Sequence, residues 1–404
     1  MSFSRRFTRP IALATGFCAL VGGRLHGQQP VSRADAVAAA LSRGARAALG
    51  RADTAATRAA LRTARLYPNP TLAATYTKDV PHYHVIGDVP LDLPWLRSAR
   101  IGSAAAARDA GRYGFAFERA AIRLDVDTTY THALAARARA RLSRRTAADA
   151  DSLLAMARLR HEVGDVSELD VRLAEVNAGQ LQNVAADDSL GALDALLAVQ
   201  LAMGLPADAP SITLTDSLMP PVDSVPTTAG EPLPVAAAAA SLRSAERAVT
   251  FAHRSVFASP SLQLGVEQGD PTGPGGALPT IGLSLPLPLF NRNGGEVAQA
   301  LAARDRAQAT LDLVRRQTDG EVARARRGFI QARARLDRDR RLLASADRVA
   351  AMALQAYAEG AFALPSVLEA QRNAREALGR YIDDMVAAND AAAAVRLFAA
   401  GDEP

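Results

Sequence analysis

Two related stretches decide the fold: residues 69–76 read NPTLAATY, and residues 259–266, 190 positions later, read SPSLQLGV. In both, apolar side chains alternate with small or polar ones, and this period of two indicates a β-strand with one apolar face. A polar turn follows each strand, at residues 78–83 and at the Gly/Pro-rich residues 269–277. A second alternating segment then follows, over residues 85–93 and 281–287. Each half of the chain therefore predicts one β-hairpin.

Long helical tracts surround both hairpins. Helices are expected over 32–66 and 235–257 before them, and over about 98–160 and 296–358 after them, where proline is absent. Sixty-odd helical residues span roughly 90 Å. Each long helix breaks at a glycine, Gly164 or Gly360, and return helices are expected over 168–203 and 366–399. The chain therefore predicts a mainly α fold with a small β part.

The same element order occurs twice, which indicates two tandem repeats. Each repeat reads helix, β-hairpin, long helix, tight turn and return helix. The expected boundaries are 28–203 for the first repeat, 204–234 for a proline-rich linker and 235–404 for the second repeat. The order, spacing and duplication of these elements support the two-repeat organisation more strongly than any single motif does.

Composition excludes several classes of protein. One Cys in 404 residues rules out a disulfide framework and a Cys-based zinc site. Beyond residue 27 the chain carries 43 basic and 42 acidic residues with mixed signs, so no basic stripe for nucleic acid is expected. The phosphate-loop GxxxxGK[ST], the nucleophile elbow GxSxG and the zinc motif HExxH are all absent from the sequence. The chain is therefore not expected to be an enzyme or to need a cofactor.

The first 27 residues have the shape of a secretory signal peptide. Arg5, Arg6 and Arg9 precede a short apolar run over residues 11–21, and a cut near Gly23 or Gly27 is expected. Cleavage would remove the single Cys, which suits an oxidising compartment. No later segment approaches ~18 consecutive apolar residues, so no transmembrane helix is expected in the mature chain.

The predicted strands do not complete a structure in one chain. Four strands with one apolar face apiece cannot close a barrel, and open strand edges are not tolerated in lipid. Several copies must therefore pool their strands, and a shared barrel on top of a helical tube satisfies both parts of the pattern. The residues expected to face lipid are Leu72, Ala74, Tyr76, Leu262, Leu264, Val266, Leu283 and Leu285.

This arrangement resembles the TolC-type outer-membrane efflux protein family over nearly all of the mature chain. The strand start at 69–72, the strand-to-helix junction LPLPLFNR at 285–292 and the two glycine turns carry the resemblance. The junction is most similar to the branch that serves heavy-metal exporters of the resistance-nodulation-division type. The resemblance implies a homotrimer with a 12-stranded β-barrel in outer-membrane lipid and a long periplasmic α-helical barrel. It also implies a passive duct that works with a periplasmic adaptor and an inner-membrane pump, and it favours heavy-metal cations as the cargo.

The resemblance also assigns roles at the far end of the helices. The two turns become the periplasmic tips that meet the adaptor, although helix hairpins need glycine there in any case. The tip residues are Gly164, Asp165, Val166, Ser167, Gly360, Ala361, Phe362 and Ala363. Glu369 becomes a carboxylate ring that gates cations, or else an ordinary solvated surface residue. Ser366 stands where the family often has a second acidic residue.

Two questions stay open at this level. His82 and His84, in the first hairpin loop, have the spacing of two ligands to one metal, but no third ligand is identifiable and plain loop residues are the alternative. The alternative function is a secreted coiled-coil scaffold or a periplasmic adaptor subunit of such a pump. Adaptors usually carry one helical hairpin, whereas this chain has two β-hairpins in matching places. Contact of the apolar strand faces with lipid separates the two functions.

Overall fold

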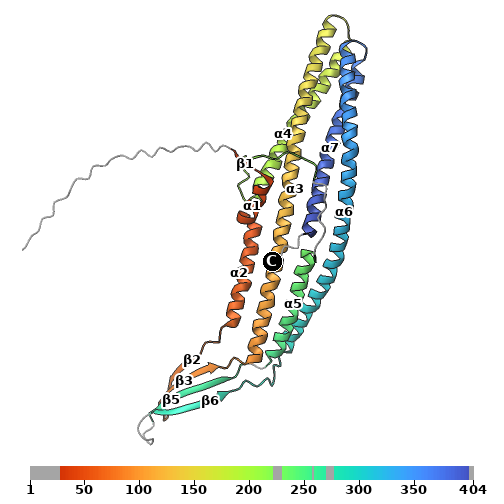
Figure 1. Ribbon diagram of the computed structural model, residues 1–404. Coiled ribbons are helices and arrows are strands. Elements are labelled where there is room, and N and C mark those ends of the chain that lie inside the picture. Colours follow the sequence, from red (N-terminus) through yellow and green to blue (C-terminus); the bar gives the residue numbers. More distant parts are fainter. Residues whose placement is uncertain (1–27, 222–229, 257–258, 270–276, 400–404) are drawn as a thin grey trace, which may run out of the picture.

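The computed structural model describes residues 28–221, 230–256, 259–269 and 277–399. The predicted signal peptide, residues 1–27, lies outside the described residues. Figure 1 shows a long rod of helices with a small sheet at one end and two helical turns at the other. The mainly helical fold with a small β part is confirmed. Among the described helices, none combines the length and the apolar character that crossing a membrane requires.

The elements come in the same order in both halves. The helices are α1 (Arg33–Arg43), α2 (Ala45–Arg65), α3 (Pro94–Glu162), α4 (Glu168–Ala202), α5 (Leu233–Arg254), α6 (Gly294–Ala358) and α7 (Leu364–Ala399). The strands are β1 (Gln29–Val31), β2 (Thr71–Tyr76), β3 (Tyr83–Pro90), β4 (Ile212–Leu214), β5 (Ser261–Gln268) and β6 (Ala277–Ser284). The 69 residues of α3 span roughly 100 Å.

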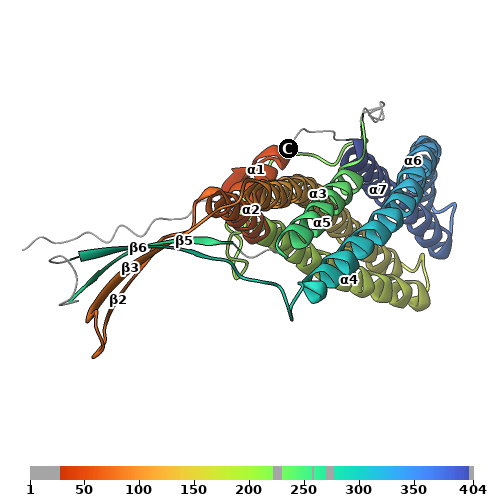
Figure 2. The same cartoon turned by 90° about the horizontal axis from the view of Figure 1, so that it is seen from below.

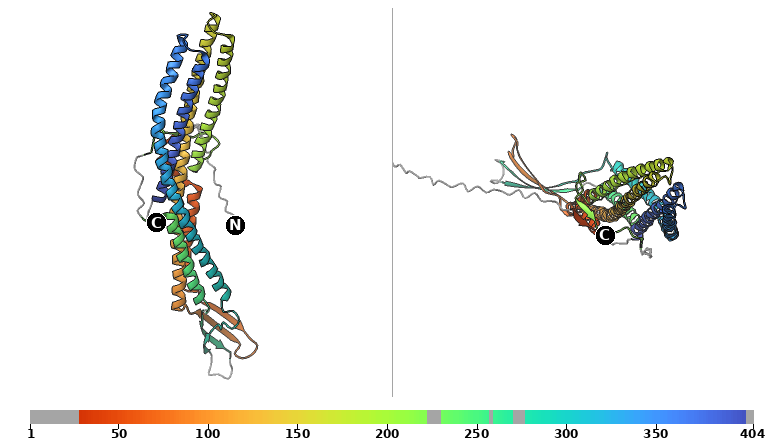
Figure 3. Two further views of the ribbon diagram at one scale, coloured as in Figure 1. Left: turned by 90° about the vertical axis from the view of Figure 1, so that its right-hand side faces the viewer. Right: turned by 90° about the horizontal axis from the view of Figure 1, so that it is seen from above.

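Two helical hairpins form the half of the rod away from the sheet. α4 returns along α3 and α7 returns along α6, and α3 also packs against α7, which joins the two repeats (Figures 1 and 3). Alanine dominates the buried positions of these helices; Ala157 and Ala388, for example, have no exposed surface. Small side chains let helices approach closely, so the Ala-rich composition suits slender, closely packed coils.

The largest core cluster lies midway along the rod. Tyr130 is fully buried there, and its hydroxyl donates to the Val31 carbonyl at 2.9 Å. The buried amide of Gln200 orders the chain that follows α4. It donates to the Pro206 and Ala209 carbonyls and accepts from the Ser211 amide at 2.7 Å. The segment expected to be a linker is therefore partly built into the core.

Two short strands and one kink depart from the predicted pattern. β1 pairs in parallel with β4, which follows more than 180 positions later and lies inside the region expected to be a linker. The helix expected over 32–66 is divided at Gly44, whose extended backbone separates α1 from α2. A Cβ atom at Gly44 would lie 2.3 Å from the Ala40 carbonyl oxygen, so only glycine fits this break.

The two hairpins combine into one antiparallel sheet in the order β2-β3-β5-β6. β3 of the first repeat pairs with β5 of the second over eight residues. β2 and β6 are left as the two edges. Seen from below, the sheet extends to one side of the helix bundle (Figure 2). The sheet is therefore an open one, shared equally by the two repeats.

Candidate functional site

The sheet has one apolar face. Residues paired across antiparallel strands point to the same side, so the register connects Leu72, Gly87, Leu264 and Ile281 in one cross-strand row. A neighbouring row contains Ala74, Val85 and Val266. Most large side chains on this face are exposed, among them Leu72 at 75% and Leu264 at 47%, whereas Leu262 is partly buried. The predicted lipid-facing residues Leu72, Ala74, Tyr76, Leu262, Leu264, Val266 and Leu283 all lie on this face, and Leu285 lies one residue beyond the end of β6.

The opposite face is polar. Asp88 lies on it and accepts hydrogen bonds from Ser261 Oγ at 3.0 Å and Gln263 Nε2 at 3.3 Å. Nearer the hairpin loops, His84 Nδ1 lies 3.5 Å from Glu267 Oε1. A sheet with lipid-like chemistry on one face and hydrogen-bonding groups on the other suits a wall between an apolar phase and water.

The two histidines singled out from the sequence both contact Thr77. His82 Nδ1 lies 3.2 Å from the Thr77 carbonyl, and His84 Nε2 lies 3.1 Å from the Thr77 hydroxyl. Within the described residues, no group of three His, Cys, Asp or Glu side chains has the geometry to hold a metal ion. The structure thus brings Glu267 to His84 without completing a ligand set.

Both predicted tight turns are Schellman motifs. Gly164 and Gly360 adopt φ values of +80° and +77°. In the first turn the Asp165 amide donates to the Arg160 carbonyl at 2.8 Å, and in the second the Ala361 amide donates to Ala356 at 2.8 Å. These bonds satisfy the last helical carbonyls, and the left-handed backbone explains why glycine occupies both positions.

Arg160 joins the two turns to each other. Its Nη1 donates to the Tyr357 carbonyl of α6 at 2.7 Å, and its guanidinium stacks over the Tyr357 ring at 4.8 Å. Its Nε donates to Asp165 in its own turn at 2.7 Å. One side chain of the first repeat therefore holds the end of the second repeat's long helix.

A small apolar cluster lies behind this clamp. Leu153 and Ala157 of α3 pack against Tyr357, Leu364 and Val367, all of them buried. Burial raises the pKa of the Tyr357 hydroxyl above its usual value, and no hydrogen-bond partner of that hydroxyl is found among the described residues. The start of α7 is thereby fixed against α3.

The predicted gate positions lie on the exposed side of α7. Ser366 and Glu369 are one turn apart and both exposed, while Leu364 and Val367 occupy the buried side. The predicted tip residue Phe362 is half exposed. Ser366, Glu369 and Phe362 are therefore exposed, whereas the opposite side of this turn packs against α3.

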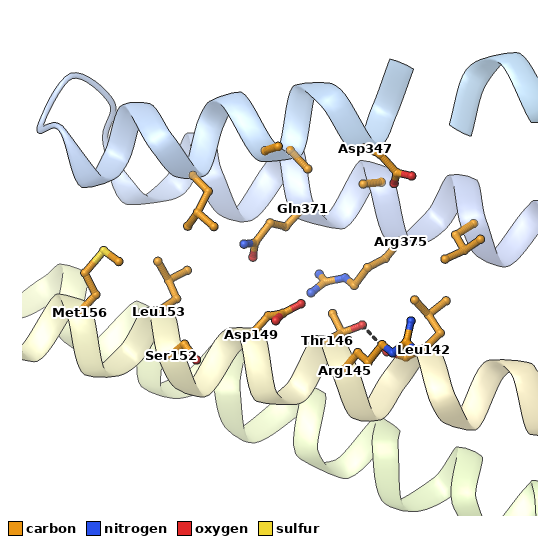
Figure 4. Close-up of a pocket in the computed structure, with 15 residues that line it drawn as sticks. Leu142, Arg145, Thr146, Asp149, Ser152, Leu153, Met156, Asp347, Gln371 and Arg375 are labelled. Atoms are coloured by element: carbon orange, nitrogen blue, oxygen red, sulfur yellow. Dashed lines mark hydrogen bonds between the residues drawn. The ribbon is translucent and has the colours of Figure 1, made fainter. Parts of the chain in front are cut away.

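A cavity of about 420 Å³ separates α3 from the α6/α7 pair two to five turns from the tips (Figure 4). Arg375 extends into it from α7 toward Thr146 and Asp149 of α3. Burial lowers the pKa of Arg375 below the usual arginine value. The two helical hairpins are therefore separated here by a partly polar space.

The sequence pattern did not reveal three of these features. Arg160, Tyr357 and Arg375 carry no motif, because they meet helices of the other repeat; Arg160 and Tyr357 are 197 positions apart in the chain, and Arg375 is farther still from Thr146 and Asp149. The sequence offered one signal: Tyr357 is an aromatic residue three positions before Gly360, the glycine that ends the helix.

An amphipathic sheet at one end of a rod of helical hairpins is the arrangement that the sequence led us to expect of an outer-membrane channel subunit. Comparison with known proteins then gives the family: residues 233–401 match the family of outer membrane efflux proteins. The second half of the chain is therefore similar to this family, which confirms the resemblance found in the sequence. The family is one of passive channels rather than enzymes.

Individual proteins are similar to this chain over most of its length. The chain is 26% identical over 336 residues to the cobalt-zinc-cadmium resistance protein CzcC of Cupriavidus metallidurans, covering 79% of this chain and 78% of CzcC. A crystal structure of a membrane protein from Pseudomonas aeruginosa has the same fold, with a TM-score of 0.76, 21% identity and coverage of 91% and 93%. CusC, a protein that forms a transmembrane channel, matches with a TM-score of 0.74, 16% identity and coverage of 91% and 92%.

Proposed function

We propose that this chain is an outer membrane efflux protein and forms the outer-membrane duct of a tripartite exporter of heavy-metal cations, assembled as a homotrimer. The observation that carries the proposal is the sheet register, which places most of the large apolar side chains of the four strands on one face. β2 and β6 are open edges. Pairing β6 of one copy with β2 of the next, three times over, closes a barrel of twelve strands and removes every edge.

The helices offer a second surface for other copies. α4 and α6 each carry large apolar side chains that are exposed in the single chain. On α4 these are Leu169, Leu173, Val176, Val184, Leu190 and Leu193, and on α6 they are Leu313, Ile330, Leu342, Val349 and Met352. Burial of these side chains between neighbouring copies would build the periplasmic α-helical barrel below the strands.

The two tips are the proposed contacts with a periplasmic adaptor, which connects the duct to an inner-membrane pump. They are exposed, lie farthest from the sheet and are held in one geometry by Arg160. Glu369 is the proposed gate residue, since three copies of this exposed carboxylate favour cations in a narrow opening. Heavy metals as cargo rest on the name of the CzcC relative.

Separated membranes test the assembly with a pair of matched variants. Ala74→Lys places a charge on the apolar face, where it costs about 2–4 kcal/mol at mid-membrane depth, and Thr75→Lys places the same charge one residue away on the polar face. We expect a crosslinked species of three times the monomer mass in the outer membrane for the parent and Thr75→Lys, and its loss for Ala74→Lys. A soluble periplasmic monomer in the parent contradicts the proposal.

Growth measurements test the cargo. Deletion of the gene in its own host should increase sensitivity to cobalt, zinc and cadmium, with restoration by the parent and not by Ala74→Lys. If the deletion strain becomes sensitive to a lipophilic drug but keeps its metal tolerance, the duct proposal stands and its cargo is the drug rather than the metals.

A further inference from the structure

We propose that the last two turns of α2, next to the sheet, bind the phosphate group of an anionic phospholipid. Arg58, Arg62 and Arg65 lie at spacings of four and three residues and therefore share one side of the helix. All three are exposed, and none has a side-chain ion pair or hydrogen bond among the described residues. The inference rests on the proposed function, because it requires the sheet to lie in a membrane.

The first half of α2 shows what its arginines do when a partner is present. Arg46 is paired with Glu118 at 2.8 Å and with Asp125 at 3.2 Å. Arg51 donates to the Leu41 carbonyl at 2.7 Å. The arginines of this helix therefore have partners within the chain at its start and are free of them toward the sheet.

The nearest acidic group at the junction is already neutralised. The side chain of Asp92 is fully buried, 2.8 Å from Arg100 and 3.2 Å from Arg97. The same two arginines donate to the carbonyls that end α2, at Ala64 and Arg65. Asp92 is thus unavailable to the three free arginines, and their positive charge is available to a partner from outside the chain.

An apolar, aromatic surface adjoins the arginines at the junction. Leu66 and Tyr67 follow α2 directly, and Trp95 begins α3; each is at least half exposed. Phe290, in the second strand-to-helix junction, is fully exposed. Aromatic side chains of this kind gather where a membrane meets water.

Charge and apolar surface together select the ligand. Three guanidinium groups over about 10 Å of helix match the depth of the phosphate layer, and arginine binds phosphate through two parallel hydrogen bonds. A free phosphate ion would use the charges and leave the aromatic surface bare. A phospholipid of the inner leaflet, with a net negative head group such as phosphatidylglycerol, uses both.

Native mass spectrometry of the full-length protein in detergent tests this site. Dioleoyl phosphatidylglycerol and dioleoyl phosphatidylcholine are the two probes, and Arg58→Gln/Arg62→Gln/Arg65→Gln is the variant. The matched control changes Arg340, Arg341 and Arg348 to Gln, because these exposed arginines lie on α6 some 70 Å from its sheet end. Each arginine near a membrane surface contributes about fivefold to the affinity for an anionic lipid.

We expect the parent and the α6 control to bind phosphatidylglycerol at least tenfold more tightly than phosphatidylcholine. The α2 variant should lose this preference while it remains a trimer in the outer membrane. Equal binding of both lipids by the parent overturns the proposal, as does an α2 variant that binds like the parent or release of the lipid by equimolar inorganic phosphate. A trimeric outer-membrane protein without lipid preference would fail this inference alone, whereas a soluble monomer would fail the proposed function.

Discussion

Arg160→Gln should loosen both tips at once. The parent side chain is only 16% exposed and makes its contacts in two different helical hairpins. Glutamine keeps a polar side chain but is two heavy atoms shorter, and it removes the positive charge, the stacking on the Tyr357 ring and the paired donors. The change leaves the Schellman turns themselves intact, since these are formed by backbone groups.

The contacts set the size of the effect. A hydrogen bond from a charged donor to the half-buried Tyr357 carbonyl contributes about 1.5–3 kcal/mol. Stacking of the guanidinium on the ring adds about 0.5–1 kcal/mol. The Asp165 carboxylate is 55% exposed, so its pairing adds at most about 0.5 kcal/mol after solvent screening. Glutamine recovers part of the hydrogen bond, which leaves a net loss of about 2 kcal/mol.

Hydrogen exchange measures that loss locally. A decrease of about 2 kcal/mol in the free energy of local opening corresponds to roughly 30-fold faster exchange. We expect this acceleration at the amides of residues 161–165 and 357–361 and unchanged exchange in the sheet. Arg158→Gln is the control, since Arg158 lies 3.6 Å from Glu175 and both side chains are about half exposed.

A change within twofold is expected for that control. Exchange in Arg160→Gln that stays within twofold of the parent at residues 357–361 would refute the clamp. Equal acceleration in both variants would show that any charge removed near the tip has the same effect.

Three further changes test the core and the turns. Gln200→Leu leaves several backbone groups of the loop after α4 without hydrogen-bond partners, and it should lower the unfolding free energy by about 3 kcal/mol in thermal unfolding in detergent. The control Gln182→Leu changes an exposed residue and should alter the unfolding free energy by no more than about 0.5 kcal/mol. Gly164→Ala forces a side chain into the left-handed backbone region and should lower the unfolding free energy by about 1 kcal/mol in the same assay. Gly191→Ala lies in the interior of α4, where a Cβ atom meets open space, and should raise the unfolding free energy by about 0.5–1 kcal/mol. Burial raises the pKa of Asp127 despite nearby arginines, so its carboxylate opposes folding above that pKa. Folding favours the protonated Asp127 side chain, and the stabilisation from this preference is fully present below pH 3.8. It is lost as the pH rises through the raised pKa of Asp127 in the folded protein. Asp127→Asn should therefore increase the melting temperature more at pH 7 than at pH 4, and an equal increase at both values would contradict the reasoning.

Local periodicity made much of this fold predictable. The alternation in residues 69–76 and 259–266 places β2 and β5 within two residues of their observed bounds, because side-chain parity alone fixes which face is apolar. The later strands are less exact. β6 ends at Ser284, before the expected Leu285 and Leu287, because Pro286 and Pro288 cannot donate to a ladder.

Contacts between distant segments were not predictable in this way. The parallel pair β1–β4 has three residues in each strand, too few for a periodic signal, and its partners meet only through the shared core around Tyr130. The break at Gly44 depends on the close approach of Gly204, whose added Cβ would lie 3.1 Å from the Arg43 carbonyl oxygen. A single glycine in an Ala-rich helix gives no local indication of such an approach.

The two tips differ in how they are stabilised, and this difference bears on movement. α4 begins at a capping box in which the Ser167 hydroxyl and Asp170 bond to each other's backbone amides. The start of α7 is instead held by the buried side chains of Leu364 and Val367, which pack against α3. The first turn is therefore stabilised within its own hairpin, whereas the second depends on contact with the other repeat.

Separation of α7 from α3 at the tip would expose those two side chains, at about 1.5–3 kcal/mol each, and would break the Arg160 contacts at about 2 kcal/mol more. The total of about 5–8 kcal/mol keeps an isolated chain closed at this point. A partner shifts such an equilibrium only by its difference in affinity for the two states. An adaptor that binds only the separated form shifts the equilibrium by RT ln(1 + [L]/Kd), so opening requires an adaptor concentration about 10⁴–10⁶ times its dissociation constant for that form. We therefore expect Arg160→Gln to lower the adaptor concentration needed for opening about 30-fold, in proportion to the contact it removes.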